Sequence, residues 1–565
     1  MSKPRRLLVA GLLVIAVAGA AFVVARDQDD PLASSDLFLR RACEVPANWI
    51  RYIERGWEAQ PRRDTDLALI PEEGNWFGSF ETTSHSGPYD FLQEVPLVFY
   101  GPGFVRPLGS VDSNGETTLA DVAPTQAHLL DFDLGATDGR ILDDVLVPRE
   151  APPKLLVTVV VDGGGWNVLR RWPNAWPNIA RLMDEGASIR DAVVGSTPSI
   201  TPAVHTTLAT GAFPRRHGVM AIVMRRDDGS IGGAFAQMAR LQSGEFADPT
   251  ATLDAATLAD QWDLATDNSA KVAMLAPQNY ELGFVGHGAA LPGGDKDIAV
   301  MLAEDESSWA TNPRYFALPT YVNNGVRGPI EDLERLDAAD GKHDGLWRGH
   351  DIYRIDASPA FAPWESRVIE ALVTREGMGD DEVSDLLYVN FKSPDAAGHK
   401  WNMIAPEQRD VLVSVDIAIG RLVDFLDEEV GNRNYVLALT ADHGQTPLDT
   451  GGWPVFNGEL KSDIDKRFDH LDNGSSIVER TSTALYFLNH QEAAANGVTA
   501  EEVASWISNY RVSDNVPGGR ALLQKYEGSS NDPVFAAVIP GGRIDDVVSC
   551  SSRPGRTMGE VSAQS

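Results

Sequence analysis

Aspartate and histidine residues that could hold cations follow apolar runs of this chain in three places. The five residues are Asp162, Asp395, His399, Asp442 and His443. Asp395 and His399 are four residues apart, so one helical turn presents both side chains to the same ion. Such a pair is also common on protein surfaces, whereas Asp442 and His443 end a buried strand, where charged neighbours without a ligand are costly. The pattern predicts binding of divalent metal ions.

A threonine with the surroundings of a nucleophile lies between the first two of these places. Thr201 precedes a proline and an apolar run with helix-forming character. Its hydroxyl can therefore sit at a helix N-terminus, where backbone N–H groups favour an anion. This position suits attack on phosphate, but a threonine hydroxyl is a poor nucleophile at neutral pH, and metal coordination would have to activate it. Ser199 is the alternative nucleophile.

Three apolar runs must bring these side chains together, namely Leu155–Val161, Asp385–Phe391 and Tyr435–Thr440. Each is typical of a parallel strand buried on both faces, and residues 407–428 have an amphipathic helical pattern. The alternation predicts an α/β fold with a mostly parallel central sheet and helices on both faces. Ligands of such sheets bind at the carboxyl ends of the strands.

The ordered set of motifs resembles the alkaline phosphatase superfamily, in particular its type I phosphodiesterase and nucleotide pyrophosphatase branch. The similarity rests on the strand-end Asp162, TPAVH at residues 201–205, TGAFPRRHG at 210–218 and ADHG at 441–444. The resemblance implies an alkaline phosphatase-like fold and a site with two zinc ions. One ion would be held by Asp162, Thr201, Asp442 and His443, and the other by Asp395, His399 and a third histidine.

The third histidine is expected in residues 75–150, which resemble a family segment that normally lies near the C-terminus. His85 precedes a Pro-Tyr turn and a V-P strand at residues 95–100, as in that segment, whereas His470 lies in RFDHLDN without either feature. The resemblance therefore favours His85 as ligand and predicts a circularly permuted chain order, joined through residues 146–154. In a permuted chain the two cysteines, Cys43 and Cys550, would approach one another and pair.

The resemblance implies hydrolysis of a phosphodiester or pyrophosphate bond through a phosphothreonine at Thr201. Family diesterases commonly carry an Asn where this chain has Ile222, and monoesterases with a Thr nucleophile carry a K-x-R motif where it has Ala276-Pro277-Gln278. Lack of the basic pair favours diesters over monoesters. A phosphomonoesterase, a phosphotransferase acting on a lipid-linked or cell-envelope phosphodiester, and a non-enzymatic binding protein are the alternatives. Sulfatase chemistry is disfavoured, since neither cysteine lies in a C-x-P-x-R context.

For three further histidines, a structural role is a simpler interpretation than metal binding. His205 and His217 belong to the family pattern and are expected to brace the turn, and His287 lies either in the cleft or in an ordinary loop.

The net charge of −33 over 565 residues disfavours a stable nucleic-acid partner, which would need clustered basic residues. It does not exclude a small phosphate ester drawn in by metal ions. Residues 7–25 carry no charge; basic residues precede this segment in the sequence, and aspartates follow it. This predicts an N-terminal transmembrane helix that anchors an extracytoplasmic protein, with a cleaved signal peptide and secretion as the alternative. Nothing in the sequence indicates an oligomeric state.

The sequence patterns, together with the family resemblance, suggest five parts. Residues 1–26 would be the membrane anchor, 27–74 a linker with short helical pieces, and 75–150 the permuted segment of the catalytic domain. Residues 151–545 would form the main catalytic domain, with a cleft-lining insertion at about 226–380, and 546–565 a disordered tail.

Overall fold

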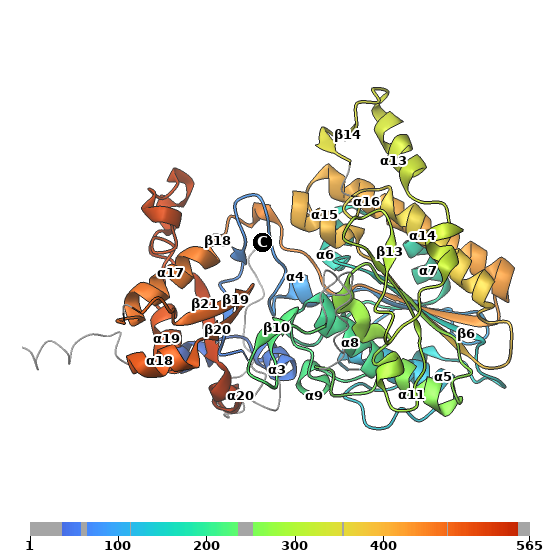
Figure 1. Cartoon of the computed structure of the whole chain (residues 1–565), viewed down its shortest axis with the longest axis horizontal. Helices are drawn as coiled ribbons and strands as arrows, with labels where there is room; N and C mark the ends of the chain where they lie inside the picture. Colours follow the sequence, from blue (N-terminus) through green and yellow to red (C-terminus); the bar gives the residue numbers. More distant parts are fainter. Residues whose placement is uncertain are drawn as a thin grey trace, which may run out of the picture.

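The computed structural model describes residues 37–57, 65–113, 115–235, 252–352, 355–471 and 473–551. The predicted N-terminal membrane helix lies outside these residues. Among the helices that are described, none is both long and apolar enough to cross a membrane. The chain forms a larger lobe around a nine-stranded sheet and a smaller lobe around a four-stranded sheet (Figure 1).

The nine-stranded sheet has a parallel centre and margins of mixed direction. Its five parallel strands, in spatial order, are β12 (Ile298–Leu302), β11 (Val272–Leu275), β16 (Asp385–Phe391), β6 (Leu155–Val161) and β17 (Tyr435–Thr440). Beyond β17 lie β3 (Leu97–Tyr100), β7 (Ala187–Ile189) and β4 (Gly109–Val111), and beyond β12 lies β13 (Trp309–Ala310). Antiparallel pairs join β3 to both β17 and β7, and β13 to β12. The sheet is therefore mixed, with the predicted parallel order at its centre.

Helices cover both faces of this sheet, and the side chains of β6 show why. Leu156 and Val160 belong to one apolar core, with α5 (Val122–Leu129), α8 (Thr201–Thr210) and α11 (Leu258–Ala265). Leu155, Val157 and Val159 belong to the other core, with α7 (Pro177–Glu185), α14 (Phe361–Glu376) and α16 (Pro406–Leu426). A strand with apolar residues on both sides must be covered on both sides.

The four-stranded sheet of the smaller lobe unites segments from both ends of the described chain. Its order is β19 (Val478–Ser482), β20 (Leu485–Leu488), β1 (Leu67–Pro71) and β21 (Phe535–Pro540), with antiparallel pairing throughout. One face packs with α17 (Asn457–Phe468) and α19 (Ala500–Ile507), while Ile70, Leu485 and Ile539 on the other join the core shared with α8. The smaller lobe thus borders the large sheet through a continuous apolar core.

This lobe corrects the predicted linker and the predicted disordered tail. Residues 27–74 include α2 (Leu37–Ala42), α3 (Ala47–Gly56) and β1, an inner strand with every residue buried. Near the other end, α20 (Ile544–Ser551) continues beyond residue 546, and a disulfide joins its Cys550 to Cys43, as predicted. These short apolar segments are ordered because they pack on each other, a long-range effect that local composition does not reveal. Residues 552–565 lie outside the described chain.

One other expectation needs correction. The stretch at 226–380 is more than a cleft-lining insertion, because β11 and β12 extend the central sheet beside β16. The three strands expected at Leu155–Val161, Asp385–Phe391 and Tyr435–Thr440 are present as β6, β16 and β17, and the helix expected at residues 407–428 is α16.

Candidate active site

Three neighbouring strands deliver the predicted metal ligands to one edge of the sheet. The register pairs Phe391 of β16 with Val161 of β6, and Thr440 of β17 with Val160. Asp162, Lys392 and Ala441 follow the last residues of these strands, so the segments that continue from them begin side by side. Asp442 and His443 come next after β17, and α15 (Ser393–Trp401) carries Asp395 in its first turn.

The first cluster consists of Asp162, Asp442 and His443, all fully buried. His443 Nε2 lies 3.6 Å from Asp162 Oδ1 and 3.3 Å from Asp442 Oδ2. None of these three buried atoms has a hydrogen-bond partner in the described chain. Tetrahedral zinc with bonds of about 2.0–2.1 Å spaces its ligands roughly 3.3 Å apart. The residues therefore fit a divalent cation, which would satisfy all three atoms at once.

The second cluster consists of His85, Asp395 and His399. Asp395 Oδ1 lies 3.5 Å from His85 Nε2 and 3.3 Å from His399 Nε2. Asp395 and His399 come from successive turns of α15, and His85 comes from the loop before α4 (Asp90–Gln93). The structure thus brings His85 to the pair from more than three hundred residues away, and this cluster also has the spacing that a zinc ion requires.

The protein backbone sets the tautomer of all three histidines in these clusters. The Nδ1 atoms of His85, His399 and His443 lie 3.2, 2.8 and 2.9 Å from the carbonyl oxygens of Ser199, Thr83 and Gly444. A carbonyl oxygen can only accept, so each Nδ1 carries the proton and donates it. Each Nε2 keeps its lone pair and faces its cluster, which is the arrangement found around metal-ligating histidines.

Asp442 and the glycine after Asp162 hold the first cluster in shape. Gly163 N–H donates to Asp442 Oδ1 at 2.9 Å, which leaves Oδ2 facing the cluster. Gly163 has φ +66°, and a Cβ there would approach the Gln445 amide to 2.8 Å. Only glycine meets both demands at low cost.

Thr201 begins α8, next to the first cluster. Lys392 Nζ lies 3.2 Å from Thr201 Oγ1, and the Thr201 hydroxyl acts against burial to lower the pKa of Asp442. Ile200 is the N-cap residue and offers no side-chain oxygen, so the first N–H groups of the helix receive no side-chain cap. The N-terminus of α8 is thus suited to an anion attached to Thr201.

Lys392, Asn390 and Gln445 were not singled out from the sequence, yet they support the site. Lys392 Nζ lies 2.7 Å from Asp395 Oδ2 and 3.0 Å from Asp162 Oδ2. Asn390 donates to Asp162 Oδ2 at 2.8 Å, and Gln445 bridges the carbonyls of Gly163 and Pro394. The available signal was position alone, since Asn390 and Lys392 flank the last residue of β16.

Burial and neighbouring charges shape the ionisation of this site. Burial, followed by the Asp442 carboxylate, raises the pKa of Asp162 to about 8, and burial raises the pKa of Asp442 to about 6. Burial acts to lower the pKa of Lys392, but Asp162 and Asp395 outweigh it and hold that pKa well above its ordinary value. Burial lowers the pKa of His85 and His443, which keeps both imidazoles neutral as metal ligands must be.

The other candidates occupy supporting or remote positions. Ser199 Oγ donates to the carbonyls of His85 and Gly87, so it secures the His85 loop. His217 braces the turn as expected, because Val219 N–H donates to its Nδ1 and its Nε2 contacts Thr207 Oγ1. His205 stacks on Phe284 and lies 3.7 Å from Asp442 Oδ2, outside both clusters.

The two remaining histidine candidates belong to neither cluster. His287 contacts Asp260 at 2.8 Å, and His470 is exposed in the smaller lobe.

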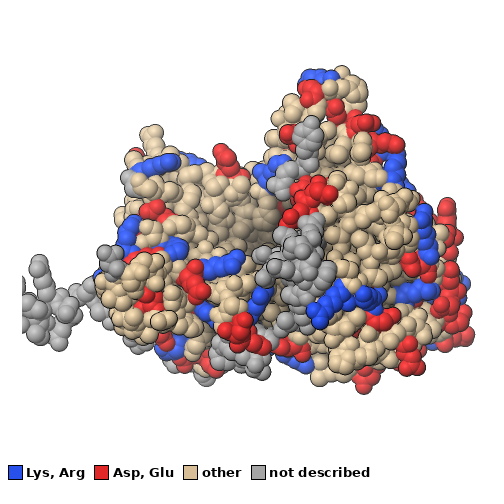
Figure 2. All heavy atoms as spheres, in the orientation of Figure 1, with Lys and Arg blue, Asp and Glu red and all other residues tan. Residues whose placement is uncertain are grey.

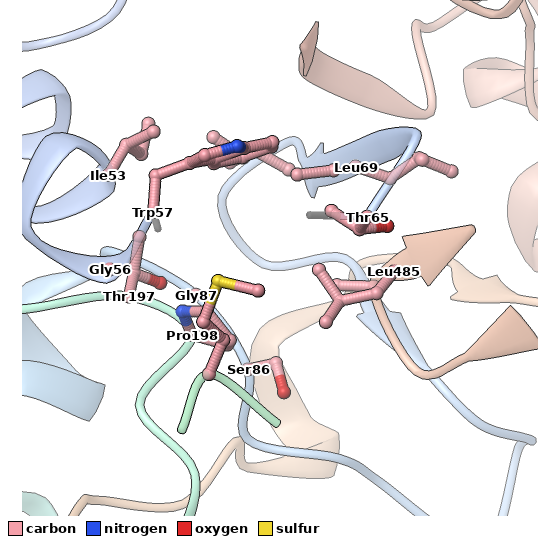
Figure 3. A pocket seen from close by; sticks show the side chains of 14 residues that line it. Ile53, Gly56, Trp57, Thr65, Leu69, Ser86, Gly87, Thr197, Pro198 and Leu485 are labelled. Carbon is pink, nitrogen blue, oxygen red and sulfur yellow. The ribbon is translucent and has the colours of Figure 1, made fainter. Parts of the chain in front are cut away.

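A pocket of about 250 Å³ opens onto Thr201, Lys392, Asp395 and His399, and residues 482–485 of the smaller lobe form its opposite wall. Figure 2 shows the surface hollowed between the two lobes on this face, with Lys and Arg side chains scattered among acidic ones. Beside it lies a smaller apolar pocket of about 40 Å³, which shares Ser86, Pro198, Ala484 and Leu485 with it (Figure 3). Both lobes therefore shape the entrance to the site.

Known proteins resemble this chain over much of its length. It is 26% identical over 346 residues to alkaline phosphatase PhoV of Synechococcus elongatus, an alignment that covers 54% of this chain and 62% of that protein. It is 21% identical over 452 residues to alkaline phosphatase PafA of Elizabethkingia meningoseptica, covering 70% and 79%.

The crystal structure of PafA aligns with a TM-score of 0.51 at 18% identity, covering 70% of this chain and 85% of that one, and so shares the fold. The sequence model of type I phosphodiesterase / nucleotide pyrophosphatase matches residues 156–548, and the chain belongs to this family.

Proposed function

We propose that this protein hydrolyses a phosphodiester or pyrophosphate bond through a phosphothreonine at Thr201, at a site that holds two zinc ions. The observation that carries the proposal is the position of the Thr201 hydroxyl, at a helix N-terminus and in contact with Asp442 and Lys392. Family membership and the alkaline phosphatase relatives support phosphoester chemistry.

In this proposal Asp162, Asp442 and His443 hold one ion together with Thr201, and His85, Asp395 and His399 hold the other. The ions would supply Lewis-acid activation and charge stabilisation at phosphorus. The chain itself orients the Thr201 oxygen in line with the scissile bond, and the N–H groups at the start of α8 stabilise the bound phosphoryl group. The wall at residues 482–485 limits how the leaving group is placed.

A phosphomonoesterase is the second candidate, and one observation favours it. Lys392 places a positive charge beside Thr201, where a dianionic monoester gains more than a diester. The relatives named above are alkaline phosphatases, which agrees with this alternative. Lack of a basic residue in the Ala276-Pro277-Gln278 segment is the reason for preferring diesters.

The anchor and the chain order remain part of the proposal. We place the enzyme outside the cytoplasm on its N-terminal helix, or secreted if that helix is cleaved, because the Cys43–Cys550 disulfide suits an oxidising compartment. A phosphotransferase acting on a membrane-linked phosphodiester fits the same location. The circular permutation is supported by His85, which lies before residue 156, where the family match begins, yet belongs to the second cluster.

The test is turnover of a panel of mono-, di- and pyrophosphate esters with zinc, with water compared against an alcohol acceptor. We expect diester turnover by the full chain and a loss of about 10³-fold or more in Thr201→Ala, with both ions still bound. Ser199→Ala tests the alternative nucleophile and should lose far less turnover than Thr201→Ala, because it removes only hydrogen bonds to the loop that carries His85. Near wild-type activity in Thr201→Ala would rule out the phosphothreonine.

A further inference from the structure

Lys392 reaches both metal-ligand clusters and the nucleophile with one ammonium group. An ammonium group has three N–H donors, and Lys392 Nζ has an acceptor for each. Asp395 Oδ2 lies at 2.7 Å, Asp162 Oδ2 at 3.0 Å and Thr201 Oγ1 at 3.2 Å. The side chain is 6% exposed, so water contributes little to its solvation.

The two carboxylates divide their oxygens between Lys392 and the clusters. Asp162 Oδ1 faces His443 and Asp395 Oδ1 faces His85 and His399, whereas both Oδ2 atoms accept from Lys392. Lys392 therefore does not occupy the positions that the ions require. Its charge lies alongside them as a third cationic centre.

The third donor of Lys392 points at the oxygen that would carry the phosphoryl group. A phosphoryl group on Thr201 Oγ1 places its non-bridging oxygens around the atom that Lys392 already contacts. Among the described residues that line this pocket, Lys392 is the only lysine or arginine. Tyr280, whose ring centre lies 5.8 Å from Nζ, and Ile222 offer no positive charge on that side.

We propose that Lys392 is a phosphoryl-binding catalytic residue, which donates to a non-bridging oxygen of the substrate and of the phosphothreonine. This inference rests on the proposed function and adds the residue that selects the substrate's charge. A dianionic phosphoryl group gains more from the ammonium than a monoanionic one. Lys392 therefore sets the ratio of monoester to diester turnover.

Binding can be tested without catalysis. In the zinc-loaded Thr201→Ala chain, calorimetric titration with inorganic phosphate measures the affinity, and elemental analysis measures the metal content. We expect added Lys392→Met to weaken phosphate binding at least about tenfold while the metal content stays the same. The same change at Lys461, which pairs with Asp465 on α17 far from the pocket, is the control and should have no effect.

Two results would overturn the inference. One is phosphate affinity within about twofold of the parent, and the other is loss of an ion, which would show that Lys392 only holds the metal ligands in place. If Lys392→Met does not fold, Lys392→Gln, which is also uncharged, answers the same question.

With Thr201 restored, kcat/KM for p-nitrophenyl phosphate should fall about 100-fold in Lys392→Met and that for bis(p-nitrophenyl) phosphate about tenfold. Equal losses would refute the role in selectivity. If the wild-type chain turns over none of the mono-, di- and pyrophosphate esters in the panel but Lys392 still governs phosphate binding, the proposed function fails and the phosphoryl-binding role stands.

Discussion

The two metal-ligand clusters differ in how the fold builds them. In the first, Asp162, Asp442 and His443 follow two adjacent strands, and every side chain is fully buried. In the second, the side chain of His399 is 43% exposed, and His85 arrives on a loop from another part of the chain. We call them the closed cluster and the open cluster.

The comparison shows that one site can combine metal ligands held at the ends of adjacent strands with metal ligands held on a loop and a helix. The closed cluster is held by backbone hydrogen bonds within one rigid sheet, and its unpartnered atoms have no access to water. The open cluster depends on the His85 loop, which contacts Ser199, and on α15, whose His399 side chain reaches the pocket. We therefore expect a tightly held ion in the first and a more exchangeable ion in the second.

Replacing His85 should break the open cluster and spare the closed one. In His85→Ala we expect about one tightly bound zinc per chain and a loss of activity on the order of 100-fold or more, because an ion with two remaining protein ligands binds weakly. Elemental analysis after dialysis, with steady-state kinetics, provides the measurement. His470→Ala is the matched control and should keep two ions, and the reverse pattern would refute His85 as a ligand.

Chelation should separate the clusters in time. With EDTA in excess we expect two phases of zinc release from the wild-type chain, with the open cluster losing its ion at least about tenfold faster. Stopped samples analysed for zinc and activity give the two rates. The faster phase should be absent from His85→Ala, and a single phase for the wild type would contradict the distinction between the clusters.

Opening the disulfide tests whether the tie between the chain ends matters to either cluster. Cys43→Ser with Cys550→Ser should lower the free energy of unfolding by about 2–4 kcal/mol, because the unfolded chain regains freedom. Turnover should change little, since β1 still pairs with β20 and β21. Thermal unfolding measures the change in stability. Equal stability of the wild type and the double variant would show that the disulfide does not stabilise the folded state.

A third acidic group shows what buried carboxylates do without histidine. Asp263, Asp295 and Asp297 lie near the start of β12, and burial, followed by the Asp295 charge, raises the pKa of Asp263 to about 7. In the unfolded chain the pKa of Asp263 is near 4, so the folded state holds the proton more tightly. The contribution of this group to the free energy of unfolding is therefore fully present below pH 4 and is lost as the pH rises towards 7.

Between pH 4.5 and 8 the wild-type chain should lose on the order of 2 kcal/mol of its free energy of unfolding through Asp263, and Asp263→Asn should remove this loss. Denaturant unfolding of the wild type and the variant at pH 4.5 and 8 measures it. Parallel stability profiles for the two proteins would show that Asp263 does not titrate in this range.

Local pattern was sufficient for the parts of the fold where neighbours in sequence decide structure. The bounds of β6, β16 and β17 were predicted to the residue, because a short run in which most side chains are apolar has few alternatives. The clusters at their ends follow from those strands. His85 could be assigned from its resemblance to a family segment, and the structure places it beside Asp395 and His399.

Features that depend on distant contacts could not be predicted. LALIP at residues 67–71 is too short to distinguish a strand from a linker, and only pairing with β20 and β21 makes it an inner strand. Lys392 was overlooked because a lysine after a strand is ordinary in sequence. Its significance comes from three acceptors contributed by three different segments.

The span of the disulfide has a consequence for how the protein is made. Cys43 and Cys550 are separated by 507 residues, so the bond cannot close until the residues between them have been synthesised. β1 must likewise wait for β20 and β21, which are synthesised more than four hundred residues later. His85 is also translated early but meets Asp395 and His399 only after more than three hundred further residues have been made, so a nascent chain lacks the open cluster until α15 has emerged.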